Sequence, residues 1–378
     1  MIKFIVSRAK EIVSCIVYSL HCFSASRKLA ELIPTPYLEN GDYDIVLSGR
    51  YFLVKEGISK NYKQLLGIKA RRSFVKPLNN NANPQSPICG QVLMLTANSS
   101  RFFDFSKKLT FTHYSTIRNV NNIVLAQQNF IGIFENTIIK VEDCCIIEQL
   151  IEYKPRDEWN SIEVINNFYF LVENYIKYLE KEYPNRKLVN FLKYQKPLLE
   201  KTSLKDFDTL YKRLENDIAK EPFVDFVYCH CDFHFGNTLF SNNGIYLIDF
   251  EYCREEVFFY DIFNVMYVEF ISKKNSTLLD LYLSEDKTMI NYMMRSFKAM
   301  HCDYDIKKKV IYFEIFLMAR LIFSCFKRPL KTNKESELRC RIKTNVSLIG
   351  KVLNYIQYFN CQGKTLECIK SERERFLL

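Results

Sequence analysis

The sequence predicts an α+β fold in which a small antiparallel sheet precedes a larger, mainly helical part. Short apolar and aromatic runs punctuated by turn residues fill residues 91–151, which is the pattern of an antiparallel meander. From residue 162 onward, apolar residues recur at the spacing of helices. A β-hairpin signal at 238–248 lies among these helices. Strands first and helices later, with one hairpin embedded in the helical part, is typical of this class.

The composition indicates a folded chain and limits its setting. Of the 378 residues, 48% are hydrophobic and 15% aromatic, which argues against disorder and allows two lobes or one large domain. The 13 cysteines are odd in number and scattered, so we expect reduced thiols and a cytoplasmic protein. The net charge of +10 would suit nucleic acid, an anionic membrane or a phosphorylated substrate. Since no basic-aromatic motif of nucleic-acid-binding proteins occurs, we do not expect a nucleic-acid partner.

We expect residues 1–89 to form an N-terminal extension that is partly helical. The apolar stretch at 12–20 is too short to span a bilayer, and Glu11 interrupts the core that a signal peptide would need. A helix docked on the domain explains the pattern, and a helix resting on the inner membrane face is the alternative. Residues 36–90 carry no clear strand or helix signal, and 79–87 read as a loop.

Residues 90–152 are predicted to form the small lobe, and residues 153–378 the large helical lobe. The elements expected in the small lobe are strands 91–96, 101–105 and 109–114, a helix at 117–128, and strands 130–134, 137–141 and 145–151. Those expected in the large lobe are a helix beginning near 158 and helices at 204–219, 262–271, 289–300, 310–326 and 342–358. Glu314 and Arg320 interrupt the apolar run at 311–323, which therefore predicts a buried core helix rather than a membrane span.

The segment with the most chemical information is 230–237, with the sequence HCDFHFGN. It places Asp232 and Asn237 in a loop after a predicted strand, and a hairpin with its turn at 241–244 then leads to Asp249. An aspartate in this loop is suited to accept a hydrogen bond from an attacking hydroxyl and to take its proton. The amide oxygen and the second carboxylate are hard ligands suited to Mg²⁺ between phosphates. The spacing therefore predicts phosphoryl transfer.

A zinc site is a rival interpretation, because thiol, imidazole and carboxylate side chains crowd residues 229–234. Structural zinc sites usually pair their ligands as C-x₂₋₄-C, with a second pair elsewhere. Cys229 and Cys231 are separated by one residue, which on a strand points their side chains to opposite faces. No matching pair follows in the sequence, so we do not expect zinc.

These residues resemble the phosphotransferase family that includes aminoglycoside phosphotransferases and choline/ethanolamine kinases, which share the protein-kinase-like fold. The family's His-Gly-Asp becomes HCD at 230–232, a departure at the middle position only. The segment IDFEY at 248–252 is similar to the metal-binding strand of choline kinases, and FYDI at 259–262 to a segment that supports the catalytic loop. The strong likeness covers about residues 225–265.

The resemblance implies a bilobal kinase that uses ATP and Mg²⁺. It implies Asp232 as the catalytic base, while His230, also in the catalytic loop, is expected to orient the loop rather than to carry a proton. It implies Asn237 and Asp249 as ligands of the magnesium that binds the nucleotide, and Asp261 as the support of the loop. The segment EQLIE at 148–152 resembles the hinge between the lobes, so Glu148 and Leu150 are expected to bind adenine through the backbone.

The likeness is incomplete where kinases hold the α- and β-phosphates. Such enzymes place a lysine on the third strand of the small lobe and pair it with a helix glutamate. The expected third strand at 109–114 contains no lysine, and the expected helix offers only Gln127 and Gln128. No Gly-rich loop is visible either. The candidate lysines are Lys55, Lys107, Lys108 and Lys140.

The acceptor of the phosphate separates the remaining alternatives. The basic charge and the long N-terminal region favour a hydroxyl of a sugar or glycan precursor, with peripheral contact to the membrane face. In a choline/ethanolamine-type kinase, Glu251, Tyr252 and Glu269 would cage a quaternary ammonium group. A catalytically silent kinase-like binding module is the third alternative. The sequence leaves the oligomeric state open.

Overall fold

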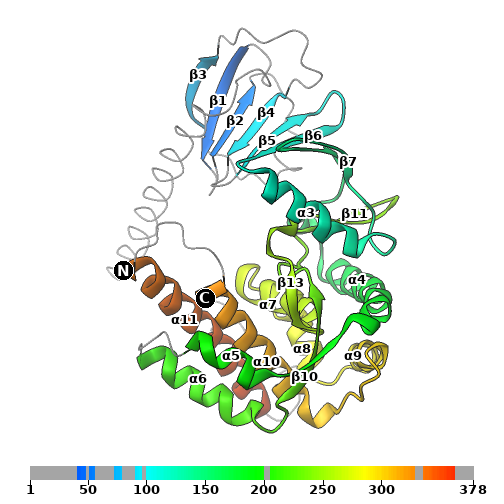
Figure 1. Cartoon of the computed structure of the whole chain (residues 1–378), viewed down its shortest axis with the longest axis vertical. Helices are drawn as coiled ribbons and strands as arrows, with labels where there is room; N and C mark the ends of the chain where they lie inside the picture. The colour runs from blue at the N-terminus through cyan, green and yellow to red at the C-terminus, as the bar shows by residue number, and fades with distance from the viewer. Residues whose placement is uncertain are drawn as a thin grey trace. The chain divides into compact units, whose positions relative to one another are not determined.

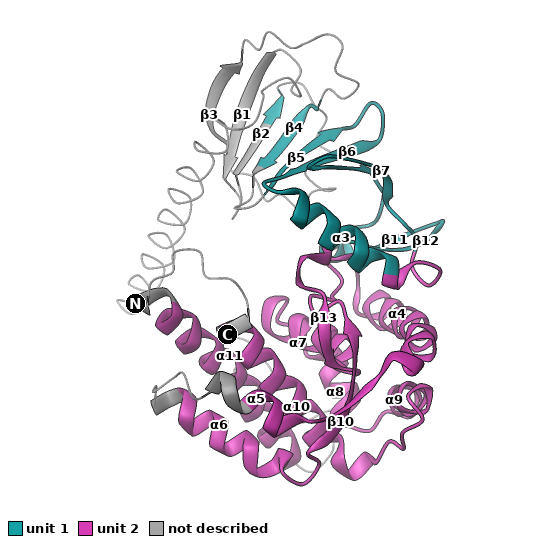
Figure 2. Cartoon of the chain, viewed as in Figure 1, with its two compact units in different colours: residues 1–128, 135–158, 239–248 teal, residues 129–134, 159–238, 249–378 magenta. Residues whose placement is uncertain are grey.

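The structure is a computed structural model, and it describes residues 41–47, 51–55, 72–78, 90–95, 99–199, 205–327 and 335–361. The helix expected at 12–20, with its membrane contact, lies outside the described residues. The chain divides into two compact units (Figure 2). Unit 1 comprises residues 1–128, 135–158 and 239–248, and unit 2 comprises residues 129–134, 159–238 and 249–378.

Unit 1 contains an antiparallel sheet of eight strands in the order β3-β1-β2-β4-β5-β6-β8-β7 (Figure 1). The strands are β1 (Gly41–Leu47), β2 (Tyr51–Lys55), β3 (Arg72–Leu78), β4 (Val92–Leu95), β5 (Ser99–Asp104), β6 (Leu109–Tyr114), β7 (Ile138–Glu142) and β8 (Cys145–Gln149). Helix α3 (Ile117–Phe130) follows β6. Phe102 and Phe111 stand opposite each other on β5 and β6, and both are buried, so one face of this strand pair packs as core.

The sheet begins earlier in the chain than the sequence analysis expected. Strands β1 to β3 lie within residues 1–89, and β2 pairs with β4, so the predicted boundary at residue 90 falls inside one continuous sheet. The sequence of β4, VLML, is apolar on both faces, and its backbone is paired on both edges, by β2 and by β5. The later boundary, at 152/153, stays a prediction about domains.

The other elements expected for the small lobe are present within a few residues, with one exception. The strand predicted at 130–134 is wrong, because α3 continues to Phe130 and a turn follows, in which Gly132 has a φ of 88°. A left-handed backbone of this kind suits glycine and ends the helix, although the apolar residues around it have the composition of a strand.

The predicted hairpin is formed by β11 (Thr238–Ser241) and β12 (Gly244–Leu247). Gly244 has a φ of 141°, as the tight turn requires. The expectation that the hairpin belongs to the helical part is corrected, since residues 239–248 group with unit 1. The reason is packing: Leu239 and Tyr246 form a buried cluster with Ile151.

Unit 2 is mainly helical (Figures 1 and 2). Its helices are α4 (Ser161–Glu182), α5 (Phe191–Leu199), α6 (Lys205–Ile218), α7 (Tyr260–Ser272), α8 (Thr277–Leu283), α9 (Lys287–Ala299), α10 (Lys309–Ile322) and α11 (Glu335–Cys361). A small antiparallel sheet has the order β13-β10-β9, with β9 (Lys187–Asn190), β10 (Phe223–Cys229) and β13 (Arg254–Val257). Single turns are Arg156–Glu158, Tyr183–Asn185, Phe250–Tyr252, Ile306–Lys308 and the π-helical Phe323–Lys327. A sheet-rich unit and a helical unit confirm the predicted α+β fold class.

Helices α7 and α10 form the core of unit 2 beneath the small sheet. Phe263 of α7 makes ring contacts with Phe313 and Phe316 of α10, and all three are fully buried. Glu314 and Arg320 lie within this packed helix, so the prediction of a buried core helix is confirmed. None of the described helices has the length and apolar character needed to cross a membrane.

Candidate active site

The loop at 230–237 connects β10 to the hairpin, and Asp261 in the first turn of α7 lies under it. The backbone N–H groups of His230 and Cys231 donate to the two carboxylate oxygens of Asp261, each at 2.8 Å. The hydroxyl of Tyr175 donates to the same carboxylate at 3.2 Å. Asp261 is fully buried, so these three donors take the place of the water molecules that would solvate an exposed carboxylate. The contacts support its predicted role as the loop's anchor.

Burial and hydrogen bonding act on Asp261 in opposite directions. Burial raises the pKa of the carboxyl group to about 6, although the backbone donors of His230 and Cys231 and the hydroxyl of Tyr175 lower it. Near neutral pH the group is therefore mostly ionised and accepts all three hydrogen bonds.

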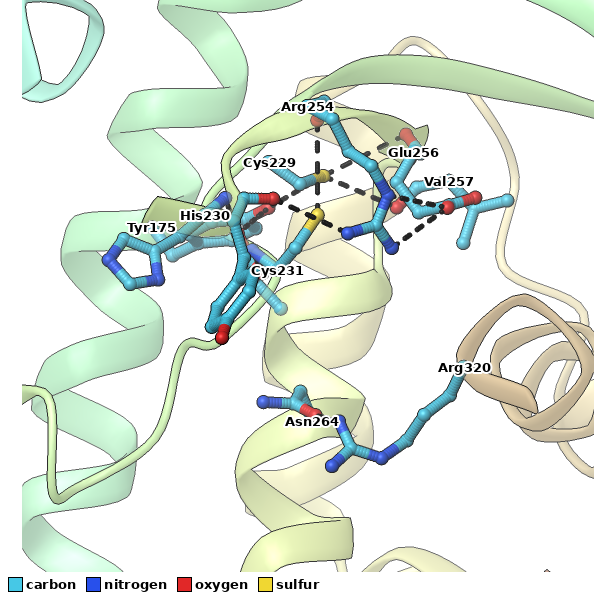
Figure 3. Close-up of polar contacts among 11 residues, drawn as sticks. Tyr175, Cys229, His230, Cys231, Arg254, Glu256, Val257, Asn264 and Arg320 are labelled. Carbon is cyan, nitrogen blue, oxygen red and sulfur yellow. Dashed lines mark hydrogen bonds and ion pairs between the residues drawn. The ribbon is translucent and has the colours of Figure 1, made fainter. Parts of the chain in front are cut away.

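Cys231 occupies the position at which the family motif has glycine, and its backbone shows why glycine suits it. Its φ is 64°, in the left-handed region that costs a residue with a Cβ atom roughly 1 kcal/mol. The conformation points the N–H of Cys231 at Asp261 while its own side chain is buried. The hydrogen bonds to Asp261 hold this strained backbone in place. Figure 3 shows Cys231 beside Cys229 and His230.

His230 is fully buried among aromatic rings. Its imidazole lies edge-on to Phe250 at 5.1 Å and also contacts Phe130 and Phe233. A ring packed in this way orients the loop, which is the role that the sequence analysis preferred to proton transfer.

Asp232 and Asn237 are brought together by the fold of the loop. The amide Nδ2 of Asn237 donates to the backbone carbonyl of Asp232 at 2.9 Å and to its Oδ2 at 3.1 Å. The side chain of Asp232 is 29% exposed, so a substrate hydroxyl can reach it. Asn237 thereby orients the carboxylate and keeps its own carbonyl oxygen Oδ1 for another partner.

His234 is a member of the site that sequence reasoning considered only as a zinc ligand. Its Nε2 lies 3.7 Å from Oδ1 of Asp232, and its Nδ1 accepts a hydrogen bond from the N–H of Gly236 at 2.9 Å. A Cβ atom at Gly236 would come within 2.8 Å of the His234 ring, so glycine allows the ring to fold back. Burial raises the pKa of Asp232, but the electrostatic attraction of His234 and the nearby charge of Arg320 outweigh it and hold the pKa at about 2.

A second support reaches the loop from α7 and α10. Arg320 is partly buried and donates to Oδ1 of Asn264, whose Nδ2 donates to the backbone carbonyl of Phe233 at 2.9 Å. Figure 3 shows Arg320 and Asn264 together below the loop. The guanidinium also lies over the ring of Tyr267, 4.3 Å from its centroid. The sequence indicated only that Arg320 interrupts an apolar run.

Asp249 follows β12 with a φ of 67°, again a left-handed backbone in a residue that is not glycine. A single 3₁₀ turn at 250–252 comes directly after it. Aspartate tolerates this conformation better than most residues, and such strain concentrates at functional sites. Strand β13 then begins with Arg254, which lies over the ring of Phe323 at 3.6 Å and pairs with Glu256 at 3.2 Å.

The donor set fits a magnesium ion shared with the phosphates of a nucleotide. In the described part of the chain, no group of three or more His, Cys, Asp or Glu side chains could hold a metal ion by itself. Mg²⁺ in kinases takes one or two protein oxygens and completes its shell with phosphates and water. Oδ1 of Asn237, left over by the hydrogen bonds of Nδ2, and the carboxylate of Asp249 are such oxygens.

The residues predicted at the nucleotide lie in unit 1. Glu148 is on β8, where its carboxylate accepts a hydrogen bond from Thr137 at 2.8 Å. The N–H of Leu150 donates to the carbonyl of Lys108 at 2.8 Å, so only its carbonyl would serve adenine. Of the candidate lysines, the exposed ones make surface ion pairs: Lys107 with Asp104, Lys108 with Glu152, and Lys140 with Glu142.

A cavity of about 380 Å³ in unit 2 lies away from these residues. It is lined by side chains of α4 and α9, among them Glu180 and Arg295, and by none of the predicted site residues. We assign the candidate site from the geometry of the loop rather than from this cavity.

Comparison with known proteins supports the same chemistry. Residues 179–291 match the model of the phosphotransferase enzyme family, which confirms the predicted resemblance and the enzyme class, a phosphotransferase. No curated protein matches the chain in sequence.

The chain is also similar to solved structures. A choline/ethanolamine kinase family protein from Mesorhizobium loti is 12% identical, with a TM-score of 0.42 over 74% of this chain and 88% of that one. An aminoglycoside 2'-phosphotransferase in complex with GDP is 9% identical, with a TM-score of 0.47 over 68% and 89%. A choline kinase from Streptococcus pneumoniae is 14% identical, with a TM-score of 0.41 over 68% and 90%. These likenesses are weak, so the assignment rests on the family match and the geometry.

Proposed function

We propose that the protein is an ATP- and Mg²⁺-dependent phosphotransferase that transfers the γ-phosphate to a hydroxyl of a sugar or glycan precursor. The observation that carries the proposal is the pair of Asp232 and Asn237, in which an ionised and partly exposed carboxylate is held by an amide. The family match at 179–291 supports it independently.

In the proposed reaction, Asp232 accepts a hydrogen bond from the acceptor hydroxyl. The hydroxyl oxygen forms a bond to the γ-phosphorus, the bond from that phosphorus to the bridging oxygen breaks, and ADP leaves with the electron pair. The hydroxyl proton passes to Asp232 as the new bond forms. Asp261 and Asn264 hold the backbone of the loop at His230, Cys231 and Phe233, and so keep the base in place.

Asn237 and Asp249 would hold magnesium, which supplies positive charge that neutralises the phosphates. Glu148 and Leu150 would bind adenine through the backbone, and the carbonyl of Leu150 is the group that remains for it.

The surroundings of Tyr252 favour a sugar over a quaternary ammonium acceptor. The backbone carbonyl of Tyr252 accepts a hydrogen bond from Arg254, whose guanidinium already covers the neighbouring Phe323. Glu269, the other proposed member of a cage, is buried, and its carboxylate accepts a hydrogen bond from Asn275. The positive charge of Arg254 close to Tyr252 and the burial of the Glu269 carboxylate disfavour a choline site.

A cytoplasmic setting is part of the proposal. It is supported by eight cysteines in the described part of the chain that are free thiols. Peripheral contact with a membrane would depend on residues 1–40, which lie outside the described residues.

The decisive experiment is Asp232→Ala assayed with MgATP against a panel of sugars, amino sugars, choline, ethanolamine and aminoglycosides. Loss of a general base lowers turnover about 10²- to 10⁴-fold, while MgATP binding survives. Turnover that is unchanged in the variant would refute the assignment. A wild-type protein that binds nucleotide but turns over no acceptor would favour the silent binding module, and preference for choline would select the choline-type kinase.

A further inference from the structure

Strand β6 occupies the position in the sheet at which a kinase carries its phosphate-binding lysine, directly before helix α3. One of its faces carries Thr110, Thr112 and Tyr114, which are two residues apart and therefore point the same way. None of these side chains can supply a positive charge. The cation that phosphates require must come from elsewhere on this face.

This face of the sheet is the one that carries contacts to α3. Thr110 stands opposite Glu148 of β8, so their side chains share a face. Glu148 accepts a hydrogen bond from Thr137 at 2.8 Å, and Thr137 accepts one from Gln127 of α3 at 3.5 Å. Gln127 lies on the helix that carries the paired glutamate in kinases. In this chain it is linked to the carboxylate of Glu148 through the hydroxyl of Thr137.

Arg101 of β5 places its guanidinium across β6 on the same face. Arg101 stands opposite Thr112, and its Nε donates to the Thr112 hydroxyl at 2.9 Å. Its Nη2 lies 3.7 Å from Glu148 Oε2, one strand further on. The side chains of Arg101 and Glu148 are 24% and 16% exposed, so the pair is held by the sheet and still accessible to a ligand.

We propose that Arg101 binds the α- and β-phosphates of the nucleotide in place of the lysine that β6 lacks, and that Glu148 positions it. The inference rests on the proposed function, since it specifies the nucleotide side of the same reaction. A guanidinium has five N–H donors in a planar fork suited to phosphate oxygens, and the contacts to Thr112 and Glu148 orient that of Arg101 on the sheet.

The proposal adds a role for the side chain of Glu148, beside the backbone contact to adenine that is proposed for the same residue. On the proposed reading its carboxylate has the role that a helix glutamate has in other kinases, reached from a strand instead of from α3. Glu148 is then a positioning residue that acts through Arg101.

The test compares Arg101→Met and Arg101→Lys with wild type in the full chain, by calorimetric titration with MgADP and with adenosine. Arg101→Met is expected to weaken MgADP binding about 10- to 100-fold, as loss of a charge-assisted hydrogen-bond pair does, and to leave adenosine affinity within about twofold. Arg101→Lys keeps the charge but loses the planar guanidinium group. Its MgADP affinity is expected to lie between those of wild type and Arg101→Met. Lys140→Met is the matched control, because it removes an exposed charge from the same sheet.

Three outcomes would overturn the inference: MgADP affinity within about twofold of wild type in Arg101→Met, a parallel loss of adenosine affinity, or a wild type that binds neither ligand. Thermal unfolding of each variant identifies a folding defect, and if Arg101→Met fails to fold, Arg101→Lys decides by the same criterion. The proposed function fails separately. If Asp232→Ala keeps its turnover while MgADP binding depends on Arg101, the base assignment falls and this inference stands.

Discussion

The loop at 230–237 in unit 2 and the charged face of the sheet in unit 1 hold their candidate functional groups in different ways. The loop is held through hydrogen bonds of its own backbone. Two of its N–H groups donate to buried Asp261, and its carbonyl at Phe233 accepts from Asn264. The sheet face is held by side chains alone, with Arg101 against Thr112 and Glu148 on a partly exposed surface. A group anchored through buried backbone bonds is fixed before substrate arrives, whereas an exposed ion pair can adjust to a ligand. The loop should therefore be the less tolerant of the two regions.

Asp261→Ala is the strongest test of that difference. It leaves two buried N–H groups without their acceptor and removes one of the two acceptors of the Tyr175 hydroxyl, which is expected to lower the free energy of unfolding by about 3–5 kcal/mol. Urea denaturation measures the change. Asp303→Ala, at an exposed position of the same unit, should stay within about 0.5 kcal/mol of wild type. Equal effects in the two variants would mean that the loop does not depend on its anchor.

The two regions also differ in how far the sequence predicts them. Asp232, Asn237 and Asp249 could be found because their spacing lies in one short segment, where a loop and a hairpin place them with little help from the rest of the chain. Asp261 was found through its family segment. Arg101 could not be found in this way, because its partners lie on β6 and β8 and their meeting depends on strand register.

The fold shows the same division between local and long-range signals. The hairpin and the predicted helices follow local turn chemistry and periodicity, and they form where expected, whereas the short helices α5 and α8 were not predicted. Strands β1 to β3 were missed because their ranges lack a clean alternation and are specified by pairing, of β2 with β4 and of β1 with β2 and β3. Arg320 was read as a break in an apolar helix, since only tertiary packing places it beside Asn264.

Asp249→Asn tests the metal side of the loop with a smaller expected effect. Asparagine tolerates the left-handed backbone at this position, so the change removes charge without adding strain. The Mg²⁺ concentration needed for half-maximal activity is expected to rise about 10- to 100-fold. Glu255→Gln, at an exposed carboxylate on β13, serves as the control. An unchanged Mg²⁺ requirement in Asp249→Asn would remove this residue from the metal site.

Glu148→Gln tests the sheet face, where the effect should be weaker still. The amide oxygen can keep the hydrogen bond from Thr137, while the attraction to Arg101 is lost. MgADP affinity is expected to fall about 3- to 10-fold, because partly exposed ion pairs contribute about 1 kcal/mol or less. Glu142→Gln, in the exposed pair with Lys140, is the control for the loss of charge. A loss as large as that of Arg101→Met would mean that Glu148 binds the nucleotide directly.

Cys231→Gly measures the backbone strain that the contacts with Asp261 impose on the loop. Its expected effect on stability is the smallest of these changes. Removing a buried side chain lowers the free energy of unfolding. At Cys231, glycine also relieves the strain of a φ of 64°, which offsets about 1 kcal/mol of that loss. Cys229→Gly removes an equally buried side chain from regular strand β10, where no such relief exists. We therefore expect Cys231→Gly to cost about 1–2 kcal/mol less than Cys229→Gly in chemical denaturation. Equal costs would show that the loop holds no strain at this residue, and that the family's glycine is there for a reason other than backbone conformation.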